Sequence, residues 1–91
     1  MTPETASDMA ISGLQFIAGD NEQLSRFVAL SGVSPDEMRN MAQTPEFMIA
    51  ILDYFLGDEP TLLAFAASAA IDPADIPKAK FALDPQGAAE F

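Results

Sequence analysis

The sequence predicts an all-α protein: a compact bundle of five to six short helices. Three observations lead to this class. Helix start and stop signals recur along the chain, apolar residues stand three and four positions apart, and no segment alternates apolar and polar residues as a strand does. Isolated helices of about 7 to 15 residues are marginal in water, so these helices must pack against one another.

The helix boundaries are marked by residues that satisfy the free backbone groups at helix ends. Short oxygen-bearing side chains cap the starts, proline occupies first helical positions, and glycine follows the ends. The predicted structural stops and caps are Gly19, Asp20, Ser34, Gly57, Asp58 and Asp72.

Two helices are predicted before Gly32. Thr2-Pro3-Glu4 opens the first, which runs up to the stop at Gly19. Asp20 caps the second, and Gln23 stands where a capping box has its second member. Gly32 can then take the left-handed conformation that closes a helix.

Two more helices follow. Ser34-Pro35-Asp36-Glu37 combines a cap, a proline and a bonding glutamate, and it opens a third helix that runs through Met41. The same pattern begins again at Thr44-Pro45-Glu46, and the fourth helix stops at Gly57. The wide apolar face of this fourth helix consists of Phe47, Met48, Ile51, Leu52 and Phe55.

The last two helices contain more proline. Asp58 caps the fifth helix, which spans about Glu59–Ala70, and Pro60 lies in its first turn, where a missing N–H does no harm. Asp72-Pro73-Ala74-Asp75 repeats the start of the third helix, but Pro77 then falls one position too deep. We therefore expect the sixth helix to be kinked or to begin afresh at Pro77.

The length of 91 residues indicates one domain. A chain of this size buries roughly 60 to 65% of its unfolded surface, which supports one modest core. We assign residues 1–83 to this single helical domain. Residues 84–91 offer little to bury and are expected to form a flexible C-terminal tail.

The chain resembles itself at an offset of 38 positions, which aligns Gly19-Asp20 with Gly57-Asp58. Two interpretations are open: two pseudo-repeated three-helix units that share one core, or the general likeness of amphipathic helices with similar caps. If the repeat holds, positions that are apolar in both halves belong to the core. These pairs are Leu14 with Leu52, Ile17 with Phe55, Leu24 with Leu62, and Phe27 with Phe65.

Four positions are large and apolar only in the second half, and they are the candidate partner interface: Met48, Ile51, Leu56 and Leu63. One explanation is that the fourth and fifth helices are the buried central pair of the globule. The other is an exposed patch that binds a partner helix or a second copy of the chain.

The charge excludes several classes of partner. The chain has 14 acidic and 4 basic side chains, a net charge of −10, which repels phosphate backbones and anionic headgroups. We therefore expect no nucleic acid and no membrane as partners. No segment approaches the roughly 20 apolar residues of a membrane span, and the start lacks a basic and then apolar leader, so the expected location is cytoplasmic.

The residue types argue against catalysis. Histidine and cysteine are absent, which removes the commonest acid–base group and the thiolate metal ligands. The neighbouring carboxylates that could form a paired site fall in predicted first helical turns, where they cap N–H groups and complement the helix dipole; they are Asp58 with Glu59, Asp36 with Glu37, and Asp72 with Asp75. We expect no catalytic residue, no metal and no cofactor. An acyl carrier protein has similar size and acidity, but the Asp-Ser-Leu that receives its phosphopantetheine is missing.

Three blocks carry a family resemblance: 24–32, 51–59 and 62–66. Together they resemble a family of short bacterial proteins classed as a domain of unknown function, number 3572, over about residues 6 to 83. The resemblance implies a compact helical protein. It implies no established activity, ligand or catalytic residue.

These observations predict a non-enzymatic, small acidic helical module that acts on an unidentified protein partner, or by self-association, as an interaction or regulatory protein. The alternative is a helical pocket for a small apolar ligand between the two halves. The residues that would line this pocket are Phe16, Phe27, Tyr54, Phe55 and Phe65.

Overall fold

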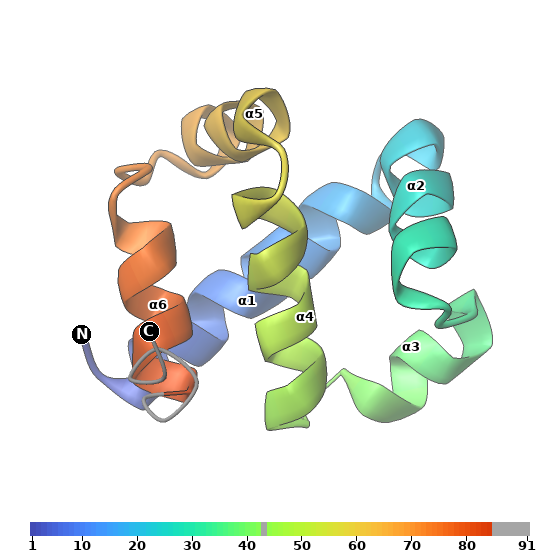
Figure 1. Ribbon diagram of the computed structural model, residues 1–91, viewed down its shortest axis with the longest axis horizontal. Helices are drawn as coiled ribbons and strands as arrows, with labels where there is room; N and C mark the ends of the chain where they lie inside the picture. Colours follow the sequence, from blue (N-terminus) through green and yellow to red (C-terminus); the bar gives the residue numbers. More distant parts are fainter. Residues whose placement is uncertain (43, 85–91) are drawn as a thin grey trace.

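Six helices joined by short turns make up the part of the chain that the structure describes, residues 1–42 and 44–84 (Figure 1). In this computed structural model they are α1 (Pro3–Ala18), α2 (Asn21–Ser31), α3 (Pro35–Met41), α4 (Pro45–Leu56), α5 (Glu59–Ala69) and α6 (Asp75–Leu83). The described residues form no strand, so the predicted all-α class is confirmed. Apart from Asp84, the predicted flexible tail lies outside the described residues.

Most predicted helix ends are confirmed. The Asp20 carboxylate accepts a hydrogen bond from the N–H of Glu22 at 2.9 Å, and the Ser34 hydroxyl accepts one from the N–H of Glu37 at 3.3 Å. Gly32 follows α2 with a φ of 74°, the left-handed conformation that glycine adopts most easily. Local sequence therefore sets these boundaries.

Gly19 and Gly57 follow α1 and α4 with nearly the same backbone geometry. Their φ and ψ angles are −79° and −6° at Gly19, and −82° and −8° at Gly57. Both predicted stops are confirmed. Because these angles lie in the right-handed region, each helix ends where the chain turns into the start of the next helix, without a left-handed residue.

Asp58 stands at the N-cap position of α5 as predicted, but the predicted side-chain cap is wrong. Its carboxylate makes no hydrogen bond to the backbone of α5. Pro60, in the first turn, has no N–H to offer. The carboxylate instead accepts hydrogen bonds from the Arg26 guanidinium and the Thr61 hydroxyl.

The predicted cap at Asp72 is also wrong. Asp72 lies in a turn ahead of the last helix, where its carboxylate accepts a hydrogen bond from the N–H of Ala74 at 2.9 Å. Helix α6 begins only at Asp75, so Pro77 occupies the third helical position. The N–H groups of the first turn have no intrahelical acceptor, so this later start accommodates Pro77 without a kink.

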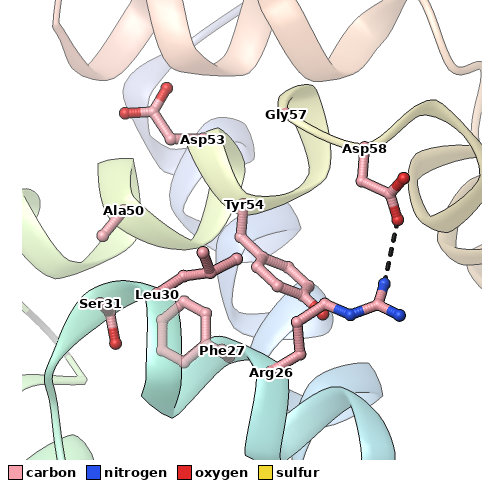
Figure 2. A pocket seen from close by; sticks show the side chains of 9 residues that line it. All are labelled: Arg26, Phe27, Leu30, Ser31, Ala50, Asp53, Tyr54, Gly57 and Asp58. Carbon is pink, nitrogen blue, oxygen red and sulfur yellow. Dashed lines mark hydrogen bonds and ion pairs between the residues drawn. The ribbon is translucent and has the colours of Figure 1, made fainter.

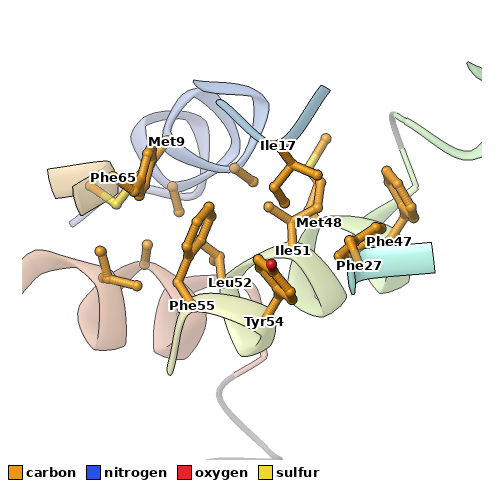
Figure 3. Close-up of a cluster of buried hydrophobic side chains, with 14 of the residues drawn as sticks. Met9, Ile17, Phe27, Phe47, Met48, Ile51, Leu52, Tyr54, Phe55 and Phe65 are labelled. Carbon is orange, nitrogen blue, oxygen red and sulfur yellow. The ribbon is translucent and has the colours of Figure 1, made fainter. Parts of the chain in front are cut away.

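Helix α4 lies at the centre of the fold. It packs against α1, α5 and α6, and α6 also packs against α1. Figure 3 shows the aromatic and aliphatic side chains that fill the space between these helices. The tightest ring contact is the stack of Phe55 on Phe65, with centroids 4.4 Å apart and planes 13° from parallel.

This central position explains most of the apolar surplus of the second half. Met48 is only 7% exposed and Ile51 only 1%, because α1 and its neighbours cover this side of α4. The prediction of a partner interface is therefore wrong for these two residues. Leu56 is half-buried against the core, and Leu63 is 47% exposed on α5.

The paired apolar positions lie in or against the core. The fully buried members are Ile17, Phe27, Leu52, Phe55 and Phe65. The half-buried members pack against this core and are Leu14, Leu24 and Leu62.

Contacts recur at the offset of 38 positions. The rings of Phe27 and Tyr54 lie 5.4 Å apart, and the rings 38 positions away, Phe65 and Phe16, lie 5.7 Å apart. The recurrence covers the pairs α1 with α2 and α4 with α5. It ends at the third helices, because α6 packs on both α1 and α4, whereas α3 contributes one buried side chain, Met38.

Helix α1 crosses α4 at Gly13. A Cβ atom at this position would lie 2.7 Å from Cε2 of Phe55 and 3.0 Å from Cγ2 of Ile51. Gly13 and Ile51 are also equivalent positions at the 38-residue offset. The smallest residue in one half therefore makes room for the large residue at the equivalent position of the other.

We expect Gly13→Ala to lower the free energy of unfolding by about 0.5 to 2 kcal/mol. The methyl group would collide with the buried Phe55 ring, and overpacking costs about 1 to 3 kcal/mol, which exceeds the roughly 0.5 to 1 kcal/mol that alanine gains inside a helix. Urea unfolding followed by circular dichroism measures the difference. Gly57→Ala is the control, because its Cβ would lie 3.4 Å from the nearest atom, an ordinary contact. A Gly13→Ala protein more stable than the wild type would contradict this close crossing.

Candidate functional site

A cleft of about 420 Å³ lies between α2 and α4 (Figure 2). The two helices run in opposite directions: Gln23 near the start of α2 contacts Tyr54 near the end of α4, and the ring of Phe27, farther along α2, lies 5.9 Å from the ring of Phe47 near the start of α4. The lining comes from the facing sides of both helices and from the turn after α4. It consists of Arg26, Phe27, Leu30, Ser31, Ala50, Asp53, Tyr54, Gly57 and Asp58.

The middle of the cleft is apolar. Phe27 and Tyr54 are both buried and meet edge to face, with planes 83° apart, so only parts of the two rings face the cleft. Leu30 stands at the rim and is 73% exposed. A large apolar side chain with most of its surface in water therefore borders an aromatic floor.

A polar network lies at one end of the cleft. Arg26 Nη1 is 3.1 Å from Asp58 Oδ2 and 3.4 Å from Thr61 Oγ1, and the Thr61 hydroxyl donates to the same Asp58 carboxylate. The Arg26 and Asp58 side chains are both partly exposed, so their ion pair contributes at most about 1 kcal/mol. The pair joins α2 to the residue that precedes α5.

Gln23 belongs to this end of the cleft and does not complete the predicted capping box. Its side-chain Oε1 accepts a hydrogen bond from the Tyr54 hydroxyl at 2.5 Å. A buried phenol needs such a partner, and this contact ties the ring of Tyr54 to α2. The tertiary hydrogen bond therefore replaces the local one.

Burial raises the pKa of Tyr54 above its ordinary value. The Arg26 guanidinium opposes this shift, because it favours the phenolate. The carboxylates of Asp58 and Asp20 add to it, because they disfavour a second negative charge. The net result is a tyrosine that stays neutral to higher pH than it does in an unfolded chain.

The charge at Asp53 is directed away from the cleft. Its carboxylate lies 2.6 Å from Nζ of Lys80 on α6, and Figure 2 shows it pointing away from Leu30. Arg26 is paired with Asp58 in the same way. Each charged group that lines the cleft therefore has a partner, and the space between them is apolar.

A second cleft, of about 360 Å³, lies between α1 and α5 and is lined by Ser12, Gln15, Phe16, Phe65, Ser68 and Ala69. Each of these six residues is 38 positions from a residue that lines the first cleft. Ser68 stands where the first cleft has Leu30, and Ala64 stands in the sequence where α2 has Arg26. The fold thus forms this hollow with a small polar residue at the rim, so the exposed Leu30 is not a requirement of the fold.

The four predicted interface residues do not come together at either cleft. Met48 and Ile51 are in the core, Leu56 packs against it, and Leu63 lies on α5 outside the lining of both clefts. The sequence did contain a signal for the cleft. At the 38-residue offset, Leu30 in the first half is larger and more apolar than Ser68 in the second half.

The predicted pocket for a small apolar ligand, lined by five rings between the halves, stays a prediction, and three of those rings pack on one another. Phe16 lies 5.9 Å from Phe55 and 5.7 Å from Phe65, centroid to centroid, and Phe55 stacks on Phe65. Phe27 and Tyr54 line the cleft between α2 and α4, Phe16 and Phe65 line the cleft between α1 and α5, and Phe55 lines neither.

Within residues 1–42 and 44–84, no three carboxylates lie close enough together to hold a metal ion. None of the helices in this part is both long and apolar enough to cross a membrane.

The chain belongs to the family described as protein of unknown function (DUF3572), whose model matches residues 3–86. The resemblance seen in the sequence is thereby confirmed. Comparison with curated proteins gives no match, and comparison with solved structures gives none. The family description assigns no activity, so a functional conclusion depends on the geometry of the cleft.

We expect the raised pKa of Tyr54 to appear as a loss of stability at alkaline pH. The pKa of Tyr54 in the folded protein is above its value in the unfolded chain, which is about 10. The neutral phenol therefore contributes its full stabilisation below about pH 10, and this contribution is lost as pH rises through the folded pKa. Tyr54 is the only tyrosine and tryptophan is absent, so phenolate absorbance near 295 nm reports this residue alone.

The measurement compares the titration midpoint of the native protein with that of the protein in urea, and the pH dependence of unfolding with that of Tyr54→Phe. The native midpoint should be the higher one, and the variant should lack the tyrosine part of the alkaline loss. Equal midpoints in both states would contradict the burial of this phenol.

Proposed function

We propose that the protein is a non-enzymatic module of the cytoplasm that binds another protein through the cleft between α2 and α4. The single observation that carries this proposal is Leu30, which is 73% exposed beside an aromatic floor. Burial of a leucine side chain contributes about 1.5 to 3 kcal/mol, so a partner that covers Leu30 gains a substantial part of a binding energy. The sequence contains no histidine or cysteine to support a catalytic alternative.

We infer in addition that α1 with α2 and α4 with α5 descend from one repeated unit. The recurring ring pairs, the matched turns at Gly19 and Gly57, and the two clefts at equivalent positions support this inference. If the two pairs share an origin, the cleft between α1 and α5 shows which lining residues of the cleft between α2 and α4 differ from the repeated unit. Leu30 and Arg26 are then additions to a common scaffold.

A protein segment fits the cleft better than a small molecule does. Small-molecule sites bury about 70 to 90% of their ligand. Here Leu30 stands mostly in water, and the Arg26–Asp58 pair is also partly exposed, so a small ligand would leave apolar surface uncovered. A protein segment can cover the cleft and its rim together.

A second copy of the chain is a poorer occupant. Each copy carries a net charge of −10, and two such surfaces repel one another. A different protein without this charge meets no such barrier. The proposal therefore favours a heterologous partner over self-association.

We expect Leu30→Glu to abolish capture of the partner from an extract of the native host, because the change places a carboxylate at the apolar rim. Leu30 is exposed, so the variant should stay within about 0.5 kcal/mol of wild-type stability. Leu63→Glu is the matched control, since Leu63 is also exposed but lies outside the cleft lining.

Affinity capture followed by mass spectrometry makes the comparison. A protein retained by the wild type and by Leu63→Glu, but lost from Leu30→Glu, is the expected result. Retention of the same proteins by all three would contradict the proposed site.

A further inference from the structure

We propose that the segment bound in the cleft between α2 and α4 is a basic amphipathic helix of the partner protein. This inference rests on the proposed function, because it names the chemistry of what the cleft binds. Two features support it: both walls of the cleft are helices, and exposed carboxylates lie in line with these walls.

The walls favour a helical segment. Both are helices, whose interior backbone N–H and C=O groups are already hydrogen-bonded to one another, so an extended peptide finds no strand edge to join. Recognition must then use side chains. A third helix laid along the groove between two antiparallel helices can place residues three and four positions apart against Leu30, Phe27 and Tyr54.

The charges favour a basic segment. Within the cleft, the lining charges are already paired with one another or with Lys80. Beyond it, Glu46 stands one turn before Ala50 on α4, and Glu22 stands one turn before Arg26 on α2, so both carboxylates lie in line with the cleft walls. Both are exposed, and neither forms an ion pair with another described residue.

The overall charge acts in the same direction. The chain carries −10, and three of its four basic side chains are engaged in ion pairs. Lysine or arginine residues that flank an apolar stripe would meet Glu22 and Glu46 and would be drawn in by the field of the whole protein. An acidic helix would meet like charges at the same positions.

The test uses a synthetic helical peptide of leucine, alanine and lysine, with leucine on one face and no aromatic residue. The matched control peptide has glutamate in place of lysine. Because Tyr54 is the only tyrosine and tryptophan is absent, the intrinsic fluorescence of the protein reports the floor of the cleft. Amide chemical shifts of ¹⁵N-labelled protein locate the binding surface.

We expect the basic peptide to change Tyr54 fluorescence in a saturable way, to shift amides of α2 and α4, and to bind more weakly as salt rises. Leu30→Ser, which introduces the residue found at the equivalent position of the other cleft, should weaken binding at least about tenfold. Leu63→Ser should leave the affinity unchanged. The acidic peptide should not bind.

Several results would overturn the inference. The first two are an acidic peptide that binds as tightly as the basic one, and a Leu30→Ser variant that binds the basic peptide with wild-type affinity. The third is a set of amide shift changes spread over α1 and α5, which would indicate unspecific attraction of a cation. The fourth is Tyr54 fluorescence that changes with protein concentration in the absence of peptide. If neither peptide binds while capture from the extract depends on Leu30, the basic-helix inference fails and the proposed function stands.

Discussion

The close crossing of α1 and α4 at Gly13 is the constraint on which the rest of the fold depends. Only a residue without a Cβ lets the backbone of α1 come this near to Ile51 and Phe55. That approach seals the side of α4 that carries Met48 and Ile51, and it brings Phe55 into line to stack on Phe65. With α4 held in this way, α6 can pack against both α1 and α4, and α5 can pack beside them.

The same crossing sets the positions of the two clefts. Helix α2 continues from the end of α1 and comes to lie beside α4, and α5 continues from the end of α4 and comes to lie beside α1. The two hollows are therefore formed by helices that correspond at the 38-residue offset, and they differ in their side chains. In one, Leu30 and Arg26 create an apolar rim and an anchored polar end; in the other, Ser68 and Ala64 stand at these positions.

Local features of the fold could be predicted from the sequence, and features that depend on distant neighbours could not. The stops at Gly19 and Gly57 and the cap at Asp20 each depend on hydrogen bonds to backbone groups only a few positions away in the sequence. Asp58 precedes its helix as Asp20 does, but Pro60 offers no N–H where Glu22 does, and the Asp58 carboxylate pairs with Arg26, which is distant in sequence. The offset of 38 positions likewise does not indicate which large apolar residues α1 covers, and the exposed Leu30, which is larger than Ser68 at the same offset, is not among the predicted interface residues.

The most direct test of the crossing at Gly13 and of the packing around it is a nuclear Overhauser measurement on the protein in solution, with selective labels on Ile51 and on the aromatic rings. We expect contact between the Gly13 α-protons and the Ile51 methyl group, together with ring contacts in both pairs that correspond at the 38-residue offset, Phe27 with Tyr54 and Phe65 with Phe16. Ring contact in only one of the two pairs, or no contact between Gly13 and Ile51, would contradict this packing.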